Sequence, residues 1–185
     1  MSARGFQIVN KSLFDVPADA LVNTVNCVGV MGAGIALEFK KRYPKMFDYY
    51  RVACDNHYIK PGDCNVYWDE EHHIYLLGLA VKNDWRNWST LEWIEASIKS
   101  LKLFLLENDV KSVNIPLLGG KNGRRGPYGP VQGMTPPPER HELQELIERE
   151  FEQFAFRHQI DVKLCIPDNT PKNDTSPNLL KFFDV

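Results

Sequence analysis

The chain has 185 residues, of which 43% are hydrophobic and 25% charged, and its formal net charge is −2 with a sequence pI near 6.2. This length and composition favour one globular domain with a single core. The slightly negative charge excludes a global positive field that would hold nucleic acid or an anionic membrane, so any nucleic-acid contact must come from a local patch.

Short apolar runs alternate with helical segments in the first half of the chain. Strands are predicted at residues 6–9, 20–25, 64–68 and 73–81. Glycines follow the second of these strands, and two helices are then predicted at residues 35–44 and 46–56, the first stopped by Pro44. The acidic stretch DEEHH separates the last two strands as a turn.

The second half continues the alternation. A helix is predicted at residues 90–107, where apolar residues recur at the spacing of one helix face and Ser89 is a candidate N-cap. The remaining predicted elements are a strand at 112–118, a Gly/Pro-rich loop at 119–138, a helix at 139–158 and a strand at 161–167. The pattern predicts an α/β fold with helices on both faces of a sheet and ligands beyond the carboxyl ends of the strands.

We expect one domain over residues 1–168 and a polar, proline-broken tail over residues 169–185, in which LLKFF could dock back. The chain opens without a charged and then apolar leader, and its four cysteines are widely spaced, which favours reduced thiols in a cytoplasmic protein. No apolar run is long enough to cross a bilayer, so we expect no membrane partner. We also expect a monomer and no cofactor.

Some residue types that bind zinc occur in the middle of the chain, at Cys54, His57, Cys64 and His72 or His73. Their gaps fit no familiar zinc finger, and scattered core cysteines explain them better. We therefore expect no metal site.

The stretch NTVNCVGVMGAGIALEFKKRYP places Gly29, Gly32 and Gly34 between a strand and a helix. Glycine lets the backbone approach a ligand, and a helix N-terminus offers unpaired N–H groups to an anion, so the loop suits a phosphate. The alternative is that these glycines only turn the chain. A second loop, LLGGKNGRRGPYG, also follows a strand, and two such loops can close on one diphosphate from both sides.

The glycine spacing differs from the dinucleotide fingerprint, and no G-K-[ST] follows as in a triphosphate loop. DALVNTVNCVGVMGAGIALEFKKRYP instead resembles the first ligand loop of macrodomains that act as DNA ADP-ribosyl glycohydrolase antitoxins, and IPLLGGKNG resembles their second loop. That branch also contains the terminal ADP-ribose protein glycohydrolase. The resemblance covers roughly Ile8 to Ile166 and implies a three-layer α/β/α macrodomain with a mixed central sheet.

The resemblance also implies roles for particular residues in binding ADP-ribose. Asn10 would face adenine, and Asn23 and Asn26 would meet the distal ribose, although both asparagines could instead only satisfy loop backbone. Backbone N–H groups of the first loop would bind phosphate, and the second loop would cover the other side of the diphosphate. The residues concerned are Gly32, Ala33, Gly34 and Ile35 in the first loop, and Leu118, Gly119, Gly120, Lys121, Asn122 and Gly123 in the second.

Lys82 is the candidate catalytic residue, because it stands where the resembling enzymes have a lysine after an apolar strand. A low-dielectric setting would lower its pKa and free the amine to act as nucleophile or base at the distal ribose. The alternative is that Lys82 is a structural lysine at a strand end, whose aliphatic stem lies along apolar surface while its ammonium reaches water. Nearby Trp85, Arg86 and Trp88 could stack on an extruded base, or could cover the end of the long helix.

The second loop departs from the family pattern. Lys121 stands where the antitoxins have glycine, and Arg124 and Arg125 follow it. The aspartate that partners the lysine in the protein-directed enzyme has no counterpart between Gly119 and Gly129, which disfavours a glutamyl-ester substrate. We therefore expect ADP-ribose removal from a modified nucleobase, with ADP-ribosylated single-stranded DNA as a candidate partner. The alternatives are hydrolysis of ADP-ribosylated protein or of ADP-ribose 1''-phosphate, and binding without turnover.

Overall fold

The computed structural model describes residues 4–120, 122–124 and 126–167. One sheet contains six strands in the order β1-β6-β5-β2-β4-β3, and every neighbouring pair is parallel except β3 with β4. The predicted mixed sheet is confirmed. The strands are β1 Phe6–Val9, β2 Ala20–Val25, β3 Cys64–Asp69, β4 Ile74–Ala80, β5 Ser112–Ile115 and β6 Asp161–Cys165.

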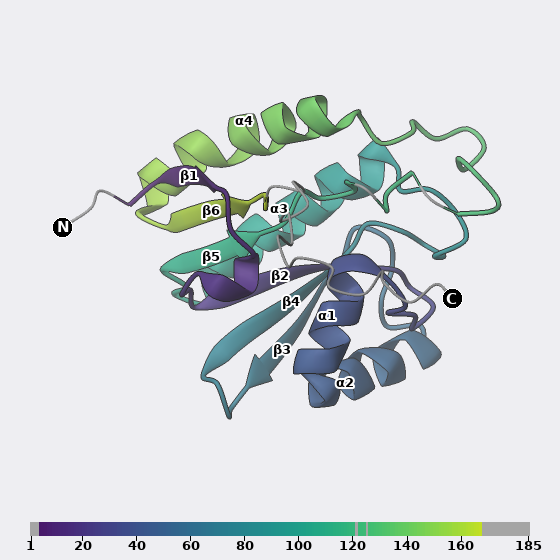
Figure 1. Ribbon diagram of the computed structural model, residues 1–185, viewed down its shortest axis with the longest axis horizontal. Helices are drawn as coiled ribbons and strands as arrows, with labels where there is room; N and C mark the ends of the chain where they lie inside the picture. The colour runs from purple at the N-terminus through teal and green to yellow at the C-terminus, as the bar shows by residue number, and fades with distance from the viewer. Residues whose placement is uncertain (1–3, 121, 125, 168–185) are drawn as a thin grey trace, which may run out of the picture.

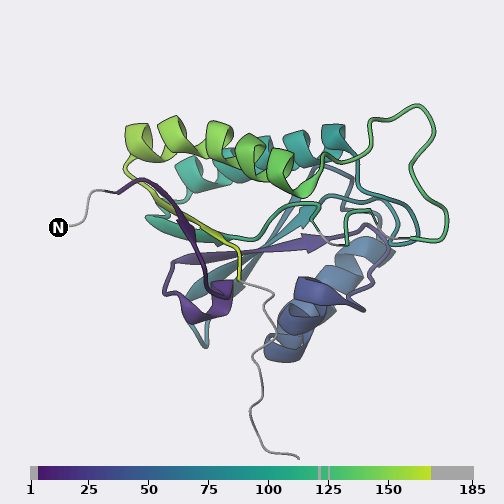
Figure 2. The same ribbon diagram turned by 45° about the horizontal axis from the view of Figure 1, so that its top comes forward.

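Helices cover both faces of this sheet, as predicted. Figure 1 and Figure 2 show α3 and α4 together on one face and α1 and α2 on the other. The helices are α1 Gly34–Arg42, α2 Pro44–Asp55, α3 Leu91–Glu107 and α4 Arg140–His158, and a short 3-10 helix, η1, spans Leu13–Asp15. The sequence patterns did not predict η1. The tail expected over residues 169–185 lies outside the described residues.

Side-chain alternation along the central strands divides the core into two layers. In β2, Ala20 and Val22 pack in the layer under α3 and α4, whereas Leu21 and Val25 pack in the layer under α1 and α2. β4 is buried over most of its length because it lies between β2 and β3 with helices on both faces. Such strands are apolar without interruption, which is why they were recognisable in the sequence.

The N-cap of α3 is Thr90, so the prediction of Ser89 is wrong. The Thr90 hydroxyl accepts a hydrogen bond from the Trp93 backbone N–H at 3.2 Å. Ser89 is fully buried, and its backbone N–H donates to the Gly123 carbonyl at 2.8 Å. A hydroxyl caps a helix only if it can reach the first-turn N–H groups, and Ser89 is instead held by the loop after β5.

The parallel strands bring the predicted site residues to one edge of the sheet. Five strands, β1, β6, β5, β2 and β4, run in the same direction, so their carboxyl ends lie side by side. Asn10 follows β1, Asn26 follows β2, and Lys82 comes just after β4. The loop beginning after β5 contains Gly119 and lies between those of β1 and β2 in the strand order.

Candidate active site

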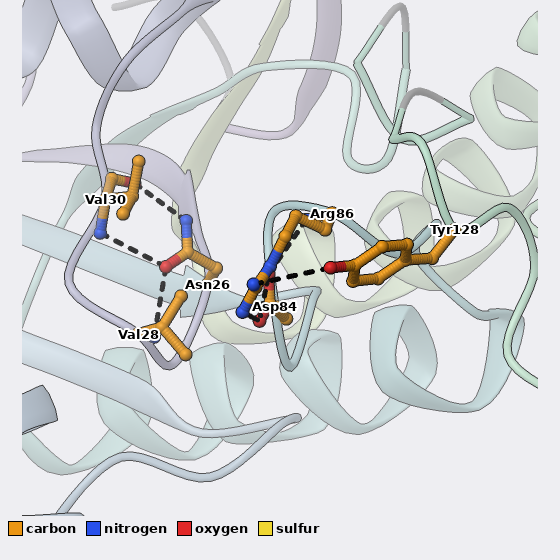
Figure 3. Close-up of polar contacts among 6 residues, drawn as sticks. All are labelled: Asn26, Val28, Val30, Asp84, Arg86 and Tyr128. Atoms are coloured by element: carbon orange, nitrogen blue, oxygen red, sulfur yellow. Dashed lines mark hydrogen bonds and ion pairs between the residues drawn. The ribbon is translucent and has the colours of Figure 1, made fainter.

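The first glycine loop is shaped by the side chain of Asn26, which is only 6% exposed. Its Nδ2 donates to the Val30 carbonyl at 2.7 Å, and its Oδ1 accepts from the backbone N–H groups of Val28 and Val30 at 3.1 and 3.2 Å (Figure 3). The Tyr50 hydroxyl of α2 donates to the Asn26 carbonyl at 2.7 Å. The amide therefore holds the loop closed, as in the loop-backbone alternative, and its ribose contact stays a prediction.

Asn23 lies inside β2 below this loop and is 2% exposed. Its Nδ2 is 3.8 Å from the sulfur of Met31, a residue that is also buried. The Oδ1 atom is buried and has no hydrogen-bond partner among the described residues. Asn23 therefore contacts Met31 of the first loop, and its ribose contact stays a prediction.

The two predicted glycine loops touch one another. Gly34, at the start of α1, has φ +56°, and a Cβ placed on it would collide with Nδ2 of Asn122 in the second loop. In the second loop, Gly119 has φ +69°, and a Cβ there would lie 2.6 Å from Cδ1 of Ile94 in α3. A Cβ on Gly123 would collide with the Gly119 carbonyl. Gly34 and Gly119 are favoured by their positive φ and by the nearby side chains of Asn122 and Ile94, and Gly123 by the close approach of the Gly119 backbone; the contact of Gly34 with Asn122 brings the two loops to one place.

The N-terminus of α1 faces this meeting point without a side-chain cap. Ala33 is its N-cap residue and the first turn contains no acidic residue, whereas Lys40, Lys41 and Arg42 occupy the last turn. The first N–H groups of a helix have no intrahelical partner, and the helix dipole favours an anion beside them. The segment from Gly32 to Ile35 therefore offers backbone N–H groups of the kind that bind phosphate, and the phosphate contact itself stays a prediction.

Lys82 emerges just beyond β4, next to the buried Val81. Burial lowers the pKa of its amine to about 8, in the direction expected for a lysine leaving an apolar strand. Its backbone is joined to the first loop, because the Cys27 thiol donates to the Lys82 carbonyl at 3.4 Å and the Cys27 N–H donates to the Asn83 carbonyl at 3.0 Å. A neutral amine is thus accessible near neutral pH beside the first loop.

The loop after Lys82 is tied to the second glycine loop. The backbone N–H groups of Trp88 and Ser89 donate to the carbonyls of Gly129 and Gly123 at 2.9 and 2.8 Å. Arg86 forms an ion pair with Asp84 and donates to the Tyr128 hydroxyl at 3.5 Å, as Figure 3 shows. The opposite charges of Asp84 and Arg86, two residues apart in the sequence, could have indicated their ion pair. Nothing in the sequence indicated the contact of Arg86 with Tyr128.

The remaining predicted site residues have less direct evidence. Asn10 is exposed after β1, at the far end of the same edge. Lys121 lies outside the described residues, as does Arg125. Arg124 points toward the start of α4, where it donates to the Pro137 carbonyl at 2.6 Å and pairs with Glu139 at 2.7 Å. Its charge is therefore engaged away from the predicted diphosphate position.

A cavity of about 620 Å³ borders the predicted site but includes none of the predicted ligand residues. Its walls come from the first loop, the end of α2 and Asn83, and comprise Cys27, Val28, Cys54, Asp55, His57, Ile59, Lys60, Pro61 and Asn83. Over the described ranges, no group of three or more His, Cys, Asp or Glu side chains is arranged to hold a metal ion. The four cysteines are free thiols, and no helix in the described part of the chain is long and apolar enough to span a membrane.

The chain is similar to several proteins of known family. A curated DNA ADP-ribosyl glycohydrolase of Thermus aquaticus is 38% identical over 120 residues, which cover 63% of this chain and 33% of the relative. One of Mycobacterium tuberculosis is 43% identical over 115 residues, covering 60% of this chain and 32% of the relative. This chain thus matches about a third of the length of these relatives.

Among solved structures, the macrodomain of Mycobacterium tuberculosis DarG superposes with a TM-score of 0.74 and 31% identity, over 89% of this chain and 100% of that one. The family model described as Macro domain matches residues 22–125, a range that contains both glycine loops and Lys82. The chain belongs to the macrodomain family.

Proposed function

We propose that this macrodomain binds ADP-ribose along the carboxyl edge of its sheet and removes it from a modified nucleobase in single-stranded DNA, acting as a monomer. The observation that carries the proposal is the position of Lys82, just beyond β4 and bonded through its backbone carbonyl to Cys27 of the first glycine loop, and burial lowers the pKa of its amine to about 8. The naming of the Thermus aquaticus and Mycobacterium tuberculosis relatives as DNA ADP-ribosyl glycohydrolases supports the choice of substrate.

The order of the strands suits the order of groups in ADP-ribose. Asn10 and Lys82 follow β1 and β4, which are four strand spacings apart, about 19 Å at the usual spacing. The two glycine loops follow β2 and β5, which lie between them. A linear ligand would therefore place adenine near Asn10, its diphosphate between the loops and its distal ribose near Lys82.

The diphosphate would lie where Gly34 and Asn122 meet. The first-turn N–H groups of α1 would bind one side, and the backbone of the loop at 119–123 would face the other side. Because both loops are fixed by internal contacts before any ligand binds, little ordering would be required on binding. Tight binding of ADP-ribose alone is therefore expected, with the reacting carbon held near Lys82.

The reaction breaks the glycosidic bond between C1'' of the distal ribose and the base. The bond's electron pair leaves with the base, which takes up a proton, and C1'' develops oxocarbenium character before it gains a hydroxyl group from water. With a pKa of about 8, roughly a tenth of Lys82 is neutral at pH 7. The neutral amine can act as base toward the water or as nucleophile toward the sugar carbon, whereas the protonated amine can assist the leaving base.

The test compares substrates on the same preparation of protein. ADP-ribose affinity is measured by calorimetric titration, and release of ADP-ribose is then measured from an ADP-ribosylated single-stranded oligonucleotide and an ADP-ribosylated protein. We expect binding and release from DNA. Release from protein alone would favour the protein-directed alternative, and binding without release from either substrate would identify a non-catalytic ADP-ribose-binding module.

A further inference from the structure

Two exposed aromatic side chains, one in the segment after Lys82 and one in the loop after β5, lie close to the guanidinium of Arg86. Trp85 is 47% exposed and Tyr128 is 62% exposed, although tryptophan and tyrosine usually bury most of their surface. The guanidinium carbon of Arg86 lies 5.9 Å from the Trp85 ring centroid and 5.4 Å from the Tyr128 ring centroid. We call Trp85, Arg86 and Tyr128 the aromatic platform.

The arginine of the platform is fixed by Asp84, whose side chain is only 14% exposed. Nε of Arg86 donates to the two carboxylate oxygens of Asp84 at 2.9 and 3.1 Å, and these bonds hold the pKa of Asp84 below its usual value. The Tyr128 N–H donates to the Arg86 carbonyl at 3.0 Å. Gly126, with φ +152°, lies so close that a Cβ there would collide with the same carbonyl.

The sequence left open whether the tryptophans after Lys82 stack on a base or cover the long helix, and the structure separates them. Trp88 is partly buried beneath Arg124, whose guanidinium carbon lies 5.9 Å from its ring centroid, next to the start of α3. Trp85 also has a guanidinium carbon, that of Arg86, 5.9 Å from its ring centroid, but it still exposes almost half of its surface. Partial burial beside the second loop therefore accounts for Trp88, whereas Trp85 keeps an exposed ring.

Resting on the glycohydrolase function above, we propose that the aromatic platform binds single-stranded DNA by stacking a nucleobase that flanks the modified one. Trp85 and Arg86 follow Lys82 by three and four residues, so the platform borders the position where the modified base would leave. Aromatic rings and guanidinium planes stack on any base, so the platform selects a flexible strand with unpaired bases rather than a particular sequence.

Charge favours stacking over phosphate binding at this place. The cation of Arg86 is compensated by Asp84, and that of Arg124 by Glu139. A protein that binds through phosphates releases counterions, so its affinity falls steeply with salt, whereas stacking on a charge-compensated platform does not. The proposal therefore predicts a shallow dependence of DNA affinity on salt.

The first measurement uses an unmodified, fluorescently labelled single-stranded oligonucleotide and the full chain, with anisotropy recorded at low and physiological salt. Trp85→Ala and Tyr128→Ala are each expected to weaken binding on the order of 10-fold. Trp85→Phe keeps an aromatic face and should lose no more than about 3-fold. Phe156→Ala is the matched control. Phe156 is an aromatic residue that is 71% exposed, but it lies within α4 rather than in a loop that follows the carboxyl end of a strand.

The second measurement compares release from an ADP-ribosylated oligonucleotide with release from a single ADP-ribosylated nucleotide. Trp85→Ala should raise KM for the oligonucleotide by about 10-fold, with a smaller effect on the single nucleotide, which offers no flanking base. ADP-ribose titration verifies that each variant is folded. An equal loss on both substrates would overturn the proposal, as would unchanged oligonucleotide affinity in both alanine variants.

Other outcomes are also decisive. A steep salt dependence that is unaffected by Trp85→Ala would assign DNA binding to phosphate contacts and overturn the platform. An equal KM increase for an ADP-ribosylated protein would make the platform a general contact surface and also overturn the proposal. If the wild-type chain releases no ADP-ribose from DNA but the alanine variants still lose oligonucleotide affinity, the proposed glycohydrolase function is wrong. The proposal that the aromatic platform binds single-stranded DNA is then supported on its own.

Discussion

The two glycine loops at the carboxyl edge of the sheet are held in different ways. The first loop is closed by its own residue Asn26, which bonds to Val28 and Val30, and by the hydroxyl of Tyr50 beneath it. The second loop has no such side-chain closure among its described residues: backbone hydrogen bonds run within it, from the Gly120 and Gly123 N–H groups to the Leu117 and Gly120 carbonyls, and hydrogen bonds from the segment after Lys82 and close packing against α3 hold it from outside.

This difference has consequences for both sequence and function. A loop that closes on itself needs particular residues at fixed spacings, which explains why the first loop carried the more specific resemblance. A loop held by neighbours can vary in its own residues as long as the contacting backbone stays in place, and Lys121, Arg124 and Arg125 are such departures. Lys82 itself is bonded to the first loop through Cys27, whereas the second loop is bonded to the segment that follows Lys82 and to the aromatic platform.

The largest expected effect comes from Lys82, which lies where the two loops are linked. Lys82→Ala should lower the rate of ADP-ribose release from DNA by about 100-fold or more, because the group acting at the distal ribose is lost. ADP-ribose affinity should stay within about 3-fold, because the other contacts come from the glycine loops. Single-turnover release and calorimetric titration measure the two quantities separately.

Lys99→Ala on the exposed face of α3 is the matched control for loss of a lysine and should behave as wild type. Trapping of a covalent adduct with borohydride during turnover would assign Lys82 the nucleophile role. Wild-type turnover in Lys82→Ala would remove this residue from the mechanism.

A second change tests whether the loops clamp a diphosphate. Gly119→Glu should weaken ADP-ribose binding about 100-fold, because a carboxylate would stand against the diphosphate and because the residue has φ +69° with Ile94 close by. Gly119→Ala carries the backbone strain and the bulk without the charge, so it should lose much less. Calorimetric titration of both variants separates the two causes.

Gly133→Glu is the matched control in the outer part of the same loop. Gly133 has φ +77°, but no described atom lies within 4 Å of a Cβ placed there, so the same substitution introduces strain and charge in open space. Its ADP-ribose affinity should be unchanged. If folded Gly119→Glu also binds normally, the diphosphate does not lie between the loops.

The positions of the strands and helices were largely predictable, because apolar runs of strand or helix period alternate with glycine and proline. The exceptions lie where tertiary contacts decide. The strand predicted at 112–118 ends at Ile115, because Leu118 is buried as a loop residue rather than as part of the ladder. Ser89 and Thr90 are both good N-cap types, and the contact of Ser89 with Gly123 decides between them.

The candidate site was predictable to different degrees in its two halves. The first loop, Lys82 and the second loop follow strands, and the parallel order brings them together as expected. Tyr128 was not predictable, because it lies in an aperiodic Gly/Pro-rich segment and meets Arg86 only through folding. The loop-shaping role of Asn26 was open in the sequence, since asparagine serves both ligands and loop backbone.

Asn26 and Asn122 provide a direct comparison of the two loops. Asn26→Ala should lower the free energy of unfolding by about 2 kcal/mol, because the buried Asn26 side chain is lost together with its three hydrogen bonds to the backbone of Val28 and Val30. Asn122→Ala should change it by less than about 0.5 kcal/mol, because its side chain is only partly buried. Urea unfolding followed by circular dichroism measures both values.

ADP-ribose affinity should fall in both asparagine variants, but for different reasons. In Asn26→Ala it falls because the first loop loses its shape, and in Asn122→Ala because a side chain between the loops is removed. Equal losses of stability in the two variants would contradict the view that an asparagine side chain closes the first loop but not the second.

The smallest expected effect is the pH dependence that Lys82 gives to activity and stability. Burial lowers the folded-state pKa to about 8, below the unfolded value near 10.4, so between these pH values the unfolded chain binds more protons. The free energy of unfolding therefore gains a contribution from Lys82 that rises with pH through this window. Lys82→Met has no titrating amine and should lack the rise.

Activity on DNA distinguishes the possible roles of the amine. If the neutral amine is the base or nucleophile, release of ADP-ribose should increase about 10-fold per pH unit below pH 8 and reach a plateau above it. If only the positive charge matters, the rate should be flat below pH 8 and fall above it, and Lys82→Arg should remain active. Single-turnover rates across this range, with ADP-ribose affinity measured at each pH, separate chemistry from binding. A rate that does not change across pH 8 in the wild-type chain would show that the titration of Lys82 does not limit the reaction. The attack at C1'' would then have to be assigned to a group other than the Lys82 amine.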